Sequence, residues 1–161
     1  MVVKKLFDEF GEETIRKYVQ KNADYYIAKW KLMSITGSKI SWNWAAFFFT
    51  SLWFGYRKMY FYGFLYITFN LLSFIPLYGI LIWLVLWFGT GMFGNYLYAI
   101  KTYQDLMEIK VTTHTQELFE KRVVEKGGTT FLGVLLMIVF GLIIYYTFMY
   151  IMMAYYGGWY Y

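Results

Sequence analysis

Charged and apolar positions divide the chain into four alternating segments. All 25 charged residues (15 Lys and Arg, 10 Asp and Glu) lie within residues 4–58 and 101–126, whereas residues 59–100 and 127–161 carry no charge. A soluble domain covers its surface with polar groups, and contiguous exposed apolar patches on such a domain stay small. Uncharged apolar runs of this length are typical of helices that cross a lipid bilayer. The pattern therefore predicts a helical membrane protein.

The first uncharged segment is too long for a single crossing. As one helix, its 42 residues would extend about 63 Å, against a hydrocarbon thickness of roughly 30 Å. Pro76 and Gly79 divide the segment, and proline disfavours the helical conformation of the residue before it. We therefore expect a hairpin of two spanning helices at about 59–75 and 79–98, and a third span at about 131–153 in the second uncharged segment.

Small and amide residues within these spans are candidates for helix packing. In a hairpin that turns near Leu77, Gly63 lies roughly opposite Gly91, and small residues let membrane helices approach closely. Asn70 and Asn95 are expected to form hydrogen bonds with a neighbouring helix. Such a bond either stays within the monomer or joins two chains in an oligomer, and the sequence leaves both alternatives open.

Residues 1–40 form a polar segment with helical periodicity. Beginning near Thr14, a possible N-cap, the spacing of apolar residues is close to 3.6, at Ile15, Tyr18, Val19, Tyr26, Trp30 and Met33. This pattern favours a basic amphipathic helix on the membrane surface, with Trp30 at headgroup depth. A helix packed on the rest of the protein has the same pattern.

The second polar segment, residues 101–128, is expected to be a helical loop on the cytoplasmic side. Its apolar positions fit two short helices, and Thr113 and Thr115 between them are N-cap candidates. The chain then divides into an amphipathic segment, residues 1–40, and a membrane domain, residues 41–161, that includes this loop.

An aromatic stretch, SWNWAAFFFTSLWFGYRKMY (41–60), precedes the first uncharged segment. Its apolar part, 44–56, would make about 20 Å of helix, which is short of the hydrocarbon thickness. If this part does not cross, all 15 Lys and Arg lie on one side of the bilayer, as the positive-inside rule requires. We therefore expect an interfacial helix at about 42–56, a cytoplasmic N-terminus and a C-terminus outside.

This aromatic helix is a candidate lipid-binding surface. One narrow stripe of its helical wheel holds the small and polar residues Asn43, Ala46, Thr50 and Arg57. The stripe would face water, a lipid headgroup or a neighbouring helix. Tryptophan prefers headgroup depth and basic side chains contact lipid phosphate, so the candidate interface residues are Trp30, Trp42, Asn43, Trp44, Arg57 and Lys58. Alternatively, the helix only seals the bundle at the interface.

Composition excludes several kinds of chemistry. Sixty per cent of the residues are hydrophobic, a quarter are aromatic, and cysteine is absent, which excludes disulfides and a cysteine nucleophile. The single histidine, His114, lies in a polar loop. No ionisable residue lies within an expected span, which argues against proton-coupled transport. We expect no catalytic residue, cofactor or metal site, and we expect anionic headgroups, rather than nucleic acid, to attract the net charge of +5.

Three motifs carry a resemblance to a known family. They are KNADYYIAKWK (21–31), SWNWAAFFF with the following LW and YRKMY (41–60), and GNYLY (94–98). Together they resemble the small bacterial membrane proteins of the domain of unknown function 2628 family, over about residues 20–100. The resemblance implies a location in the bacterial inner membrane. It brings no known activity and therefore no catalytic residue.

The sequence thus predicts an all-α membrane protein that is not an enzyme. The first functional hypothesis is an interaction protein, either an accessory subunit with a protein partner or a homo-oligomeric scaffold. The second is binding of anionic lipid headgroups at residues 42–58. A pore-forming or membrane-perturbing protein is the third and least favoured, because no polar stripe runs the length of a span.

Overall fold

The computed structural model describes residues 1–157, and these residues form helices and connecting turns without a β-strand. The prediction of an all-helical fold is confirmed. Seven α-helices and one 3-10 turn follow one another along the described chain: α1 Val2–Val19, α2 Ala23–Thr36, α3 Trp44–Tyr56, α4 Tyr60–Asn70, η1 Leu71–Phe74, α5 Gly79–Thr112, α6 Gln116–Lys126 and α7 Phe131–Gly157.

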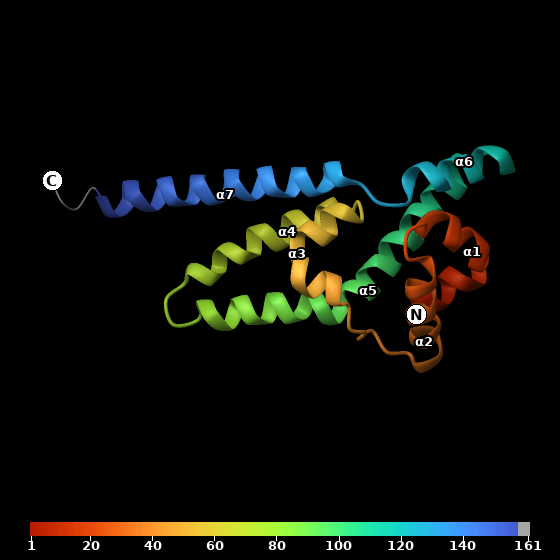
Figure 1. Ribbon diagram of the computed structural model, residues 1–161, viewed down its shortest axis with the longest axis horizontal. Coiled ribbons are helices and arrows are strands. Elements are labelled where there is room, and N and C mark those ends of the chain that lie inside the picture. The colour runs from red at the N-terminus through yellow and green to blue at the C-terminus, as the bar shows by residue number, and fades with distance from the viewer. Residues whose placement is uncertain (158–161) are drawn as a thin grey trace.

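The helices form two parts that meet around α3 (Figure 1). A head contains α1, α2, α6 and the C-terminal part of α5. An elongated part contains α4, η1, the N-terminal part of α5 and α7, which project from the head in the same direction (Figure 1). The charged residues belong to the head and its connections, since α4, η1 and α7 contain none. The separation of charge seen along the sequence is therefore also a separation in space.

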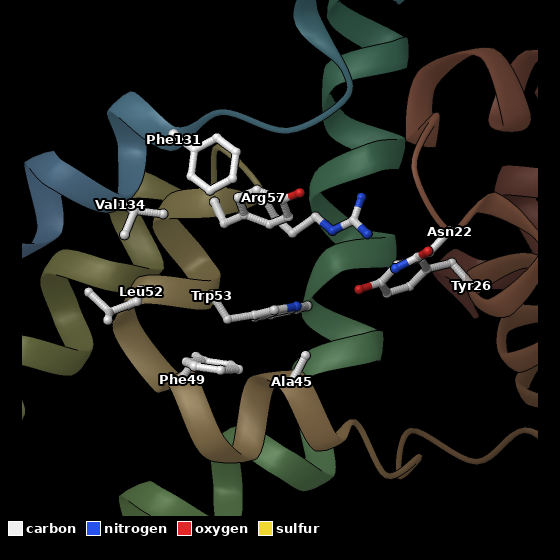
Figure 2. Close-up of a pocket in the computed structure, with 10 residues that line it drawn as sticks. Asn22, Tyr26, Ala45, Phe49, Leu52, Trp53, Arg57, Phe131 and Val134 are labelled. Carbon is white, nitrogen blue, oxygen red and sulfur yellow. The ribbon is translucent and has the colours of Figure 1, made fainter.

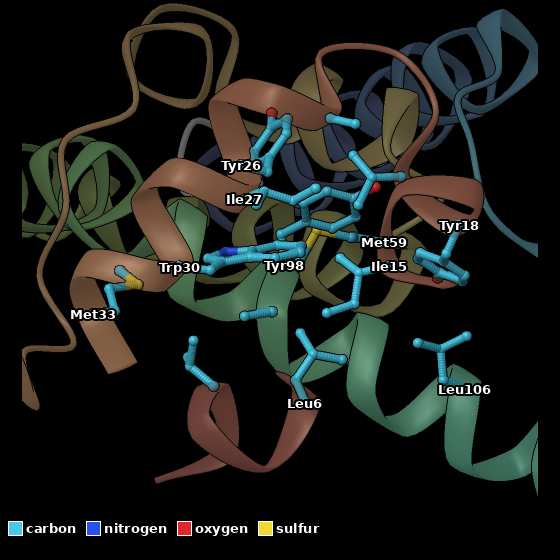
Figure 3. Packing of buried hydrophobic residues seen from close by; sticks show 14 of the residues in the cluster. Leu6, Ile15, Tyr18, Tyr26, Ile27, Trp30, Met33, Met59, Tyr98 and Leu106 are labelled. Atoms are coloured by element: carbon cyan, nitrogen blue, oxygen red, sulfur yellow. The ribbon is translucent and has the colours of Figure 1, made fainter. Parts of the chain in front are cut away.

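The head has an aromatic and aliphatic core (Figure 3). The chain reverses between α1 and α2 at two residues with positive φ, Gln20 (55°) and Asn22 (61°). This reversal packs both helices on α5 and buries the predicted apolar face, including Ile15, Tyr18 and Trp30. The packed-helix alternative thus describes residues 14–33 better than a surface helix does, and Trp30 is fully buried in the head rather than at a lipid-facing surface.

The second predicted span and the first helix of the polar loop are one continuous helix, α5. No glycine or proline interrupts the chain between residues 98 and 112. One face of α5 stays buried at spacings of three and four residues through Tyr98, Thr102, Leu106 and Ile109. The loop therefore has only one helix of its own, α6, which begins at the predicted N-cap Thr115. The Thr115 hydroxyl accepts a hydrogen bond from the Leu118 N–H (3.3 Å).

Two helices in the described chain, α5 and α7, are long and apolar enough to cross a membrane. The predicted first span differs from them: α4 has 11 residues and continues as the four-residue turn η1. These elements extend together about 24 Å at 1.5 Å per α-helical and 2.0 Å per 3-10 residue. The expectation of three regular spanning helices is therefore wrong for this segment, although α4–η1 does form a hairpin with α5 (Figure 1).

The glycines pack differently from the prediction. Gly63 lies against the Met137 side chain of α7, and a Cβ on Gly91 would lie 3.0 Å from Cβ of Phe47 in α3, so Gly63 and Gly91 do not pack on one another. The closest helix contact joins α3 to α7. There the backbones of Gly55 and Gly133 touch, and a Cβ on either would overlap the other.

Candidate functional site

Helix α3 lies between the head and the elongated part and supplies most residues of the candidate site. Its N-cap residue is Asn43, whose side-chain oxygen accepts a hydrogen bond from the Ala46 N–H (2.9 Å). A non-helical residue, Thr50 (φ 41°, ψ −113°), divides the helix into two short pieces. Trp44 and Phe48 on the first piece are mostly exposed. The predicted aromatic helix is therefore present at residues 44–56, with a kink in its middle.

The N-terminal end of the small-and-polar stripe, Asn43 and Ala46, faces a neighbouring helix, α5. The buried Asn43 side chain donates a hydrogen bond from Nδ2 to Oδ1 of Asn95 (2.8 Å). The Asn95 amide donates to Oγ of Ser41 (3.0 Å), and its main-chain oxygen accepts from Nε1 of Trp30 (2.8 Å). Asn95 therefore forms hydrogen bonds within the monomer, with Asn43, Ser41 and Trp30.

Arg57 ends α3 and is almost completely buried, with 2% of its surface exposed. Its guanidinium donates hydrogen bonds to the main-chain oxygens of Val19 (3.3 Å) and Lys21 (2.9 Å). It also lies over three aromatic rings, 4.5 Å from the centre of Tyr26, 5.2 Å from that of Tyr98 and 5.9 Å from that of Tyr56. These contacts connect α3 to the end of α1 and to α2, so Arg57 is not on the lipid-facing surface where the sequence had suggested it.

The charge of Arg57 has no acidic partner within residues 1–157. Each ion pair in this part of the chain joins other residues. The buried Nε of Arg57 also lacks a hydrogen-bond acceptor. Burial of a charge is costly unless it is paired and hydrogen-bonded. Carbonyl oxygens and aromatic faces supply only partial negative charge, so this position favours the approach of an anion.

A pocket of about 390 Å³ lies beside Arg57, between α2, α3 and α7 (Figure 2). Its lining residues come from three elements: Asn22 and Tyr26 at the start of α2, Phe131 and Val134 at the start of α7, and Ala45, Phe49, Leu52, Trp53, Tyr56 and Arg57 from α3. The volume falls in the range of small-molecule sites, roughly 300–1,000 Å³. The wall is apolar except at one end, where Figure 2 shows the Arg57 side chain extending toward Asn22 and Tyr26.

A second cation lies near the polar end of the pocket. The Lys21 ammonium is 5.6 Å from the ring centre of Tyr56. This ammonium lowers the pKa of the Tyr56 hydroxyl, chiefly through hydrogen bonding. Lys21 is exposed, whereas Arg57 is buried. The pocket thus combines an apolar wall with one positive lining residue, Arg57, and a second cation beside the lining residue Tyr56.

Lys58 connects the end of α3 to the end of α6. Its ammonium donates hydrogen bonds to the main-chain oxygens of Glu125 (3.0 Å) and Gly127, and its φ is 56°. Burial, followed by the nearby Lys101 charge, lowers the pKa of Lys58. These bonds fix the connection before α7, where the Thr130 N–H also donates to the main-chain oxygen of Tyr56 (2.9 Å).

Tyr18, Lys101 and Asp105 form a buried polar cluster next to Lys58. The Tyr18 hydroxyl and the Lys101 ammonium both donate to Oδ2 of Asp105. Burial, with the Asp105 charge as the next contribution, raises the pKa of the Tyr18 hydroxyl. Burial also lowers the pKa of the Lys101 ammonium. This cluster connects α1 to α5 within the head.

The remaining candidate residues are dispersed. Trp42 is half-buried against Phe47 and Phe88, and its Nε1 lacks a partner. Asn70 lies at the junction of α4 and η1. Within residues 1–157, no group of three or more His, Asp or Glu side chains is arranged to hold a metal ion.

The sequence did not reveal the pocket, because its wall is assembled from residues more than 70 positions apart. In the sequence, Trp53 belongs to the aromatic stretch 41–60, and Phe131 and Val134 belong to the expected span at about 131–153. The one available signal was the position of Arg57 on the same helical stripe as Asn43 and Ala46, for which a neighbouring helix was one of three predicted surroundings.

Comparison with family models, curated proteins and solved structures found no match. The resemblance to the domain of unknown function 2628 family therefore stays a prediction.

Proposed function

We propose that this chain is a multi-pass protein of the bacterial inner membrane, non-enzymatic, that binds other membrane components through α3 and the head. In this arrangement the head is cytoplasmic, α7 crosses the bilayer, and the C-terminus lies outside. The proposed partners are anionic lipids and either a protein partner or a second copy of the chain.

The observation that carries the proposal is the exposure of apolar side chains on the two long helices. On α7, apolar side chains outside the face that packs on α3 and α4 are exposed, including Leu132, Leu135, Val139, Leu142, Ile143, Tyr146 and Ile151. Helix α5 likewise has exposed apolar side chains, at Ile80, Leu81 and Val85. A core helix of a soluble protein buries these side chains, and exposed apolar surface of this extent marks an interaction with lipid or protein.

The lengths of the elements agree with this arrangement. Helix α7 (27 residues) extends about 40 Å, enough to cross roughly 30 Å of hydrocarbon with tilt. The α4–η1 arm, about 24 Å, is shorter, so the hairpin either thins the bilayer locally or enters and returns. Both alternatives bring α5 back to the side of the head, and both leave α7 as the helix that places the C-terminus outside.

The interaction role is supported by an apolar patch at the end of α2. Leu32, Ile35 and Ile40 are exposed there, with Ile35 at 83%. Lys31 and Lys39 lie beside them in the sequence. Apolar residues flanked by basic ones suit contact with a partner at the membrane surface or with anionic headgroups.

Alkaline extraction followed by native mass spectrometry tests the proposal. A membrane protein stays in the pellet after carbonate extraction, and an interaction protein released in mild detergent carries one stoichiometric partner or forms a discrete oligomer. Release of the chain into the carbonate supernatant would contradict membrane embedding. A monomer without a protein partner would contradict the accessory-subunit and scaffold roles while leaving membrane embedding intact.

A further inference from the structure

The pocket between α2, α3 and α7 lies where the head meets the elongated part. Phe131, the first residue of α7, forms part of its wall, and α7 is uncharged along its whole length. If α7 enters the bilayer, as proposed above, Phe131 lies at the inner boundary of the hydrocarbon layer. The exposed residues around the pocket, Ala45, Phe49 and Phe131, then meet lipid rather than water.

The pocket is positively charged at one end and apolar along the rest of its wall, which matches the headgroup and the acyl chain of an anionic lipid. At one end the lining residue Arg57 has a charge without an acidic partner in the described chain, and Lys21 lies beside the lining residue Tyr56. Toward the bilayer the wall is formed by Phe49, Leu52 and Val134. An anionic oxygen in the pocket would supply the negative charge that Arg57 lacks, since hydrogen bonds between guanidinium and phosphate are among the stronger ones in proteins.

We propose that this pocket binds one anionic phospholipid from the surrounding bilayer, with its phosphate near Arg57 and Lys21 and an acyl chain along Phe49, Leu52 and Val134. The inference rests on the proposed membrane location. It moves lipid binding from the outer surface of residues 42–58, as the sequence suggested, to an internal site. The volume of about 390 Å³ accommodates part of one lipid, and the remainder lies in the bilayer.

Besides connecting α3 to the end of α1 and to α2, Arg57 would bind the anionic group of the lipid. Its two terminal nitrogens already bind Val19 and Lys21, which fixes the direction of the side chain. A guanidinium held in a fixed direction is prepared for an anion, because little conformational entropy is lost on binding. A bound lipid would then stabilise the contact between α3 and α7, since α7 forms one wall of the site.

The test uses the full chain in nanodiscs that contain equal amounts of phosphatidylglycerol and phosphatidylcholine, followed by native mass spectrometry. We expect one retained phosphatidylglycerol on the wild-type chain and at least tenfold less phosphatidylcholine. Val134→Trp fills the pocket without altering Arg57 and should reduce retention at least tenfold. Val139→Trp, the same change on the outward face of α7, is the matched control and should retain the lipid.

A charge series completes the experiment. Lys21→Gln should weaken retention of phosphatidylglycerol about threefold to tenfold, whereas Lys121→Gln on α6 removes an equal charge away from the pocket and should have no effect. Equal retention of both lipids, or the same retention in Val134→Trp and Val139→Trp, would overturn the inference. If one of these results is found while the chain stays in the carbonate pellet, the lipid site is contradicted but the proposed membrane location is not. Failure of the lipid site is therefore distinguishable from failure of the membrane location.

Discussion

The side-chain amides of Asn43 and Asn95 are hydrogen-bonded to each other at 2.8 Å in the buried contact between α3 and α5. Asn43 is the N-cap residue of α3, and Asn95 belongs to α5, the long helix that continues into the head. The bond therefore determines how α3 is placed against α5. It also explains why a helix as apolar as α3 has a definite position at the boundary of the two parts.

This relationship predicts an energetic coupling between the two amides. Asn95→Leu leaves a buried N–H of Asn43 without an acceptor, which costs about 1–3 kcal/mol. Asn43→Ala should cost more, because it also removes an N-cap worth typically about 1 kcal/mol. In thermal unfolding in detergent, we expect the double variant to be less destabilised than the sum of the single variants. Strict additivity would contradict the coupling, and Asn70→Leu serves as a control with an effect below about 0.5 kcal/mol.

The contact of Gly55 with Gly133 predicts a strong dependence on side-chain size. Gly133→Ala places a methyl group against the backbone of α3, and overpacking of this kind costs roughly 1–3 kcal/mol. Gly89→Ala is the matched control, because nothing lies within 4 Å of a Cβ at Gly89 in α5. It should leave stability unchanged or raise it by up to about 1 kcal/mol. Similar melting temperatures for the two variants would argue against a close approach of α3 and α7.

The buried hydroxyl of Tyr18 should make the protein less stable at alkaline pH. Burial and Asp105 raise the pKa of its hydroxyl above the ordinary value of 10.0, so the folded state favours the neutral form. Its contribution to the free energy of unfolding is complete below pH 10 and declines above it, by about 1.4 kcal/mol per pH unit. Tyr18→Phe should be less stable than the wild type at pH 8, and the difference should shrink above pH 10. A constant difference from pH 8 to pH 11 would contradict the proposed burial of this hydroxyl.

The helical fold was predictable from the sequence because two strong signals define it. Uncharged runs identified α5 and α7, and a 3.6-residue periodicity identified the apolar faces of α2 and of the last turns of α1. The possible N-cap Thr14 is wrong, because it lies inside α1, which begins at Val2. The extent of the elements was harder to predict. Lys101 is the first charged residue after the uncharged run, and it marks a change in polarity and not the end of a helix. The sequence therefore did not indicate that α5 continues to Thr112. The reversal at Gln20 and Asn22 depends on tertiary packing that local periodicity does not contain.

The candidate site was predictable only in part. The stripe with Asn43, Ala46 and Arg57 correctly indicated a polar face on α3, but its neighbour is α5 and not a headgroup layer. The burial of Arg57 depends on the main-chain oxygens at the end of α1, and no sequence pattern encodes such contacts. The pocket depends on α7, whose position against α3 follows from the contact between Gly55 and Gly133.

The most direct test of the membrane arrangement is the labelling of single cysteines in intact cells with a membrane-impermeant maleimide. The chain has no native cysteine, so Ser38→Cys, His114→Cys and Gly158→Cys each report one position, the last beyond the described residues. We expect Gly158→Cys to react in intact cells, and Ser38→Cys and His114→Cys to react only after the cells are opened. Labelling of His114→Cys from outside would contradict a cytoplasmic head and the direction of α5 and α7 through the bilayer.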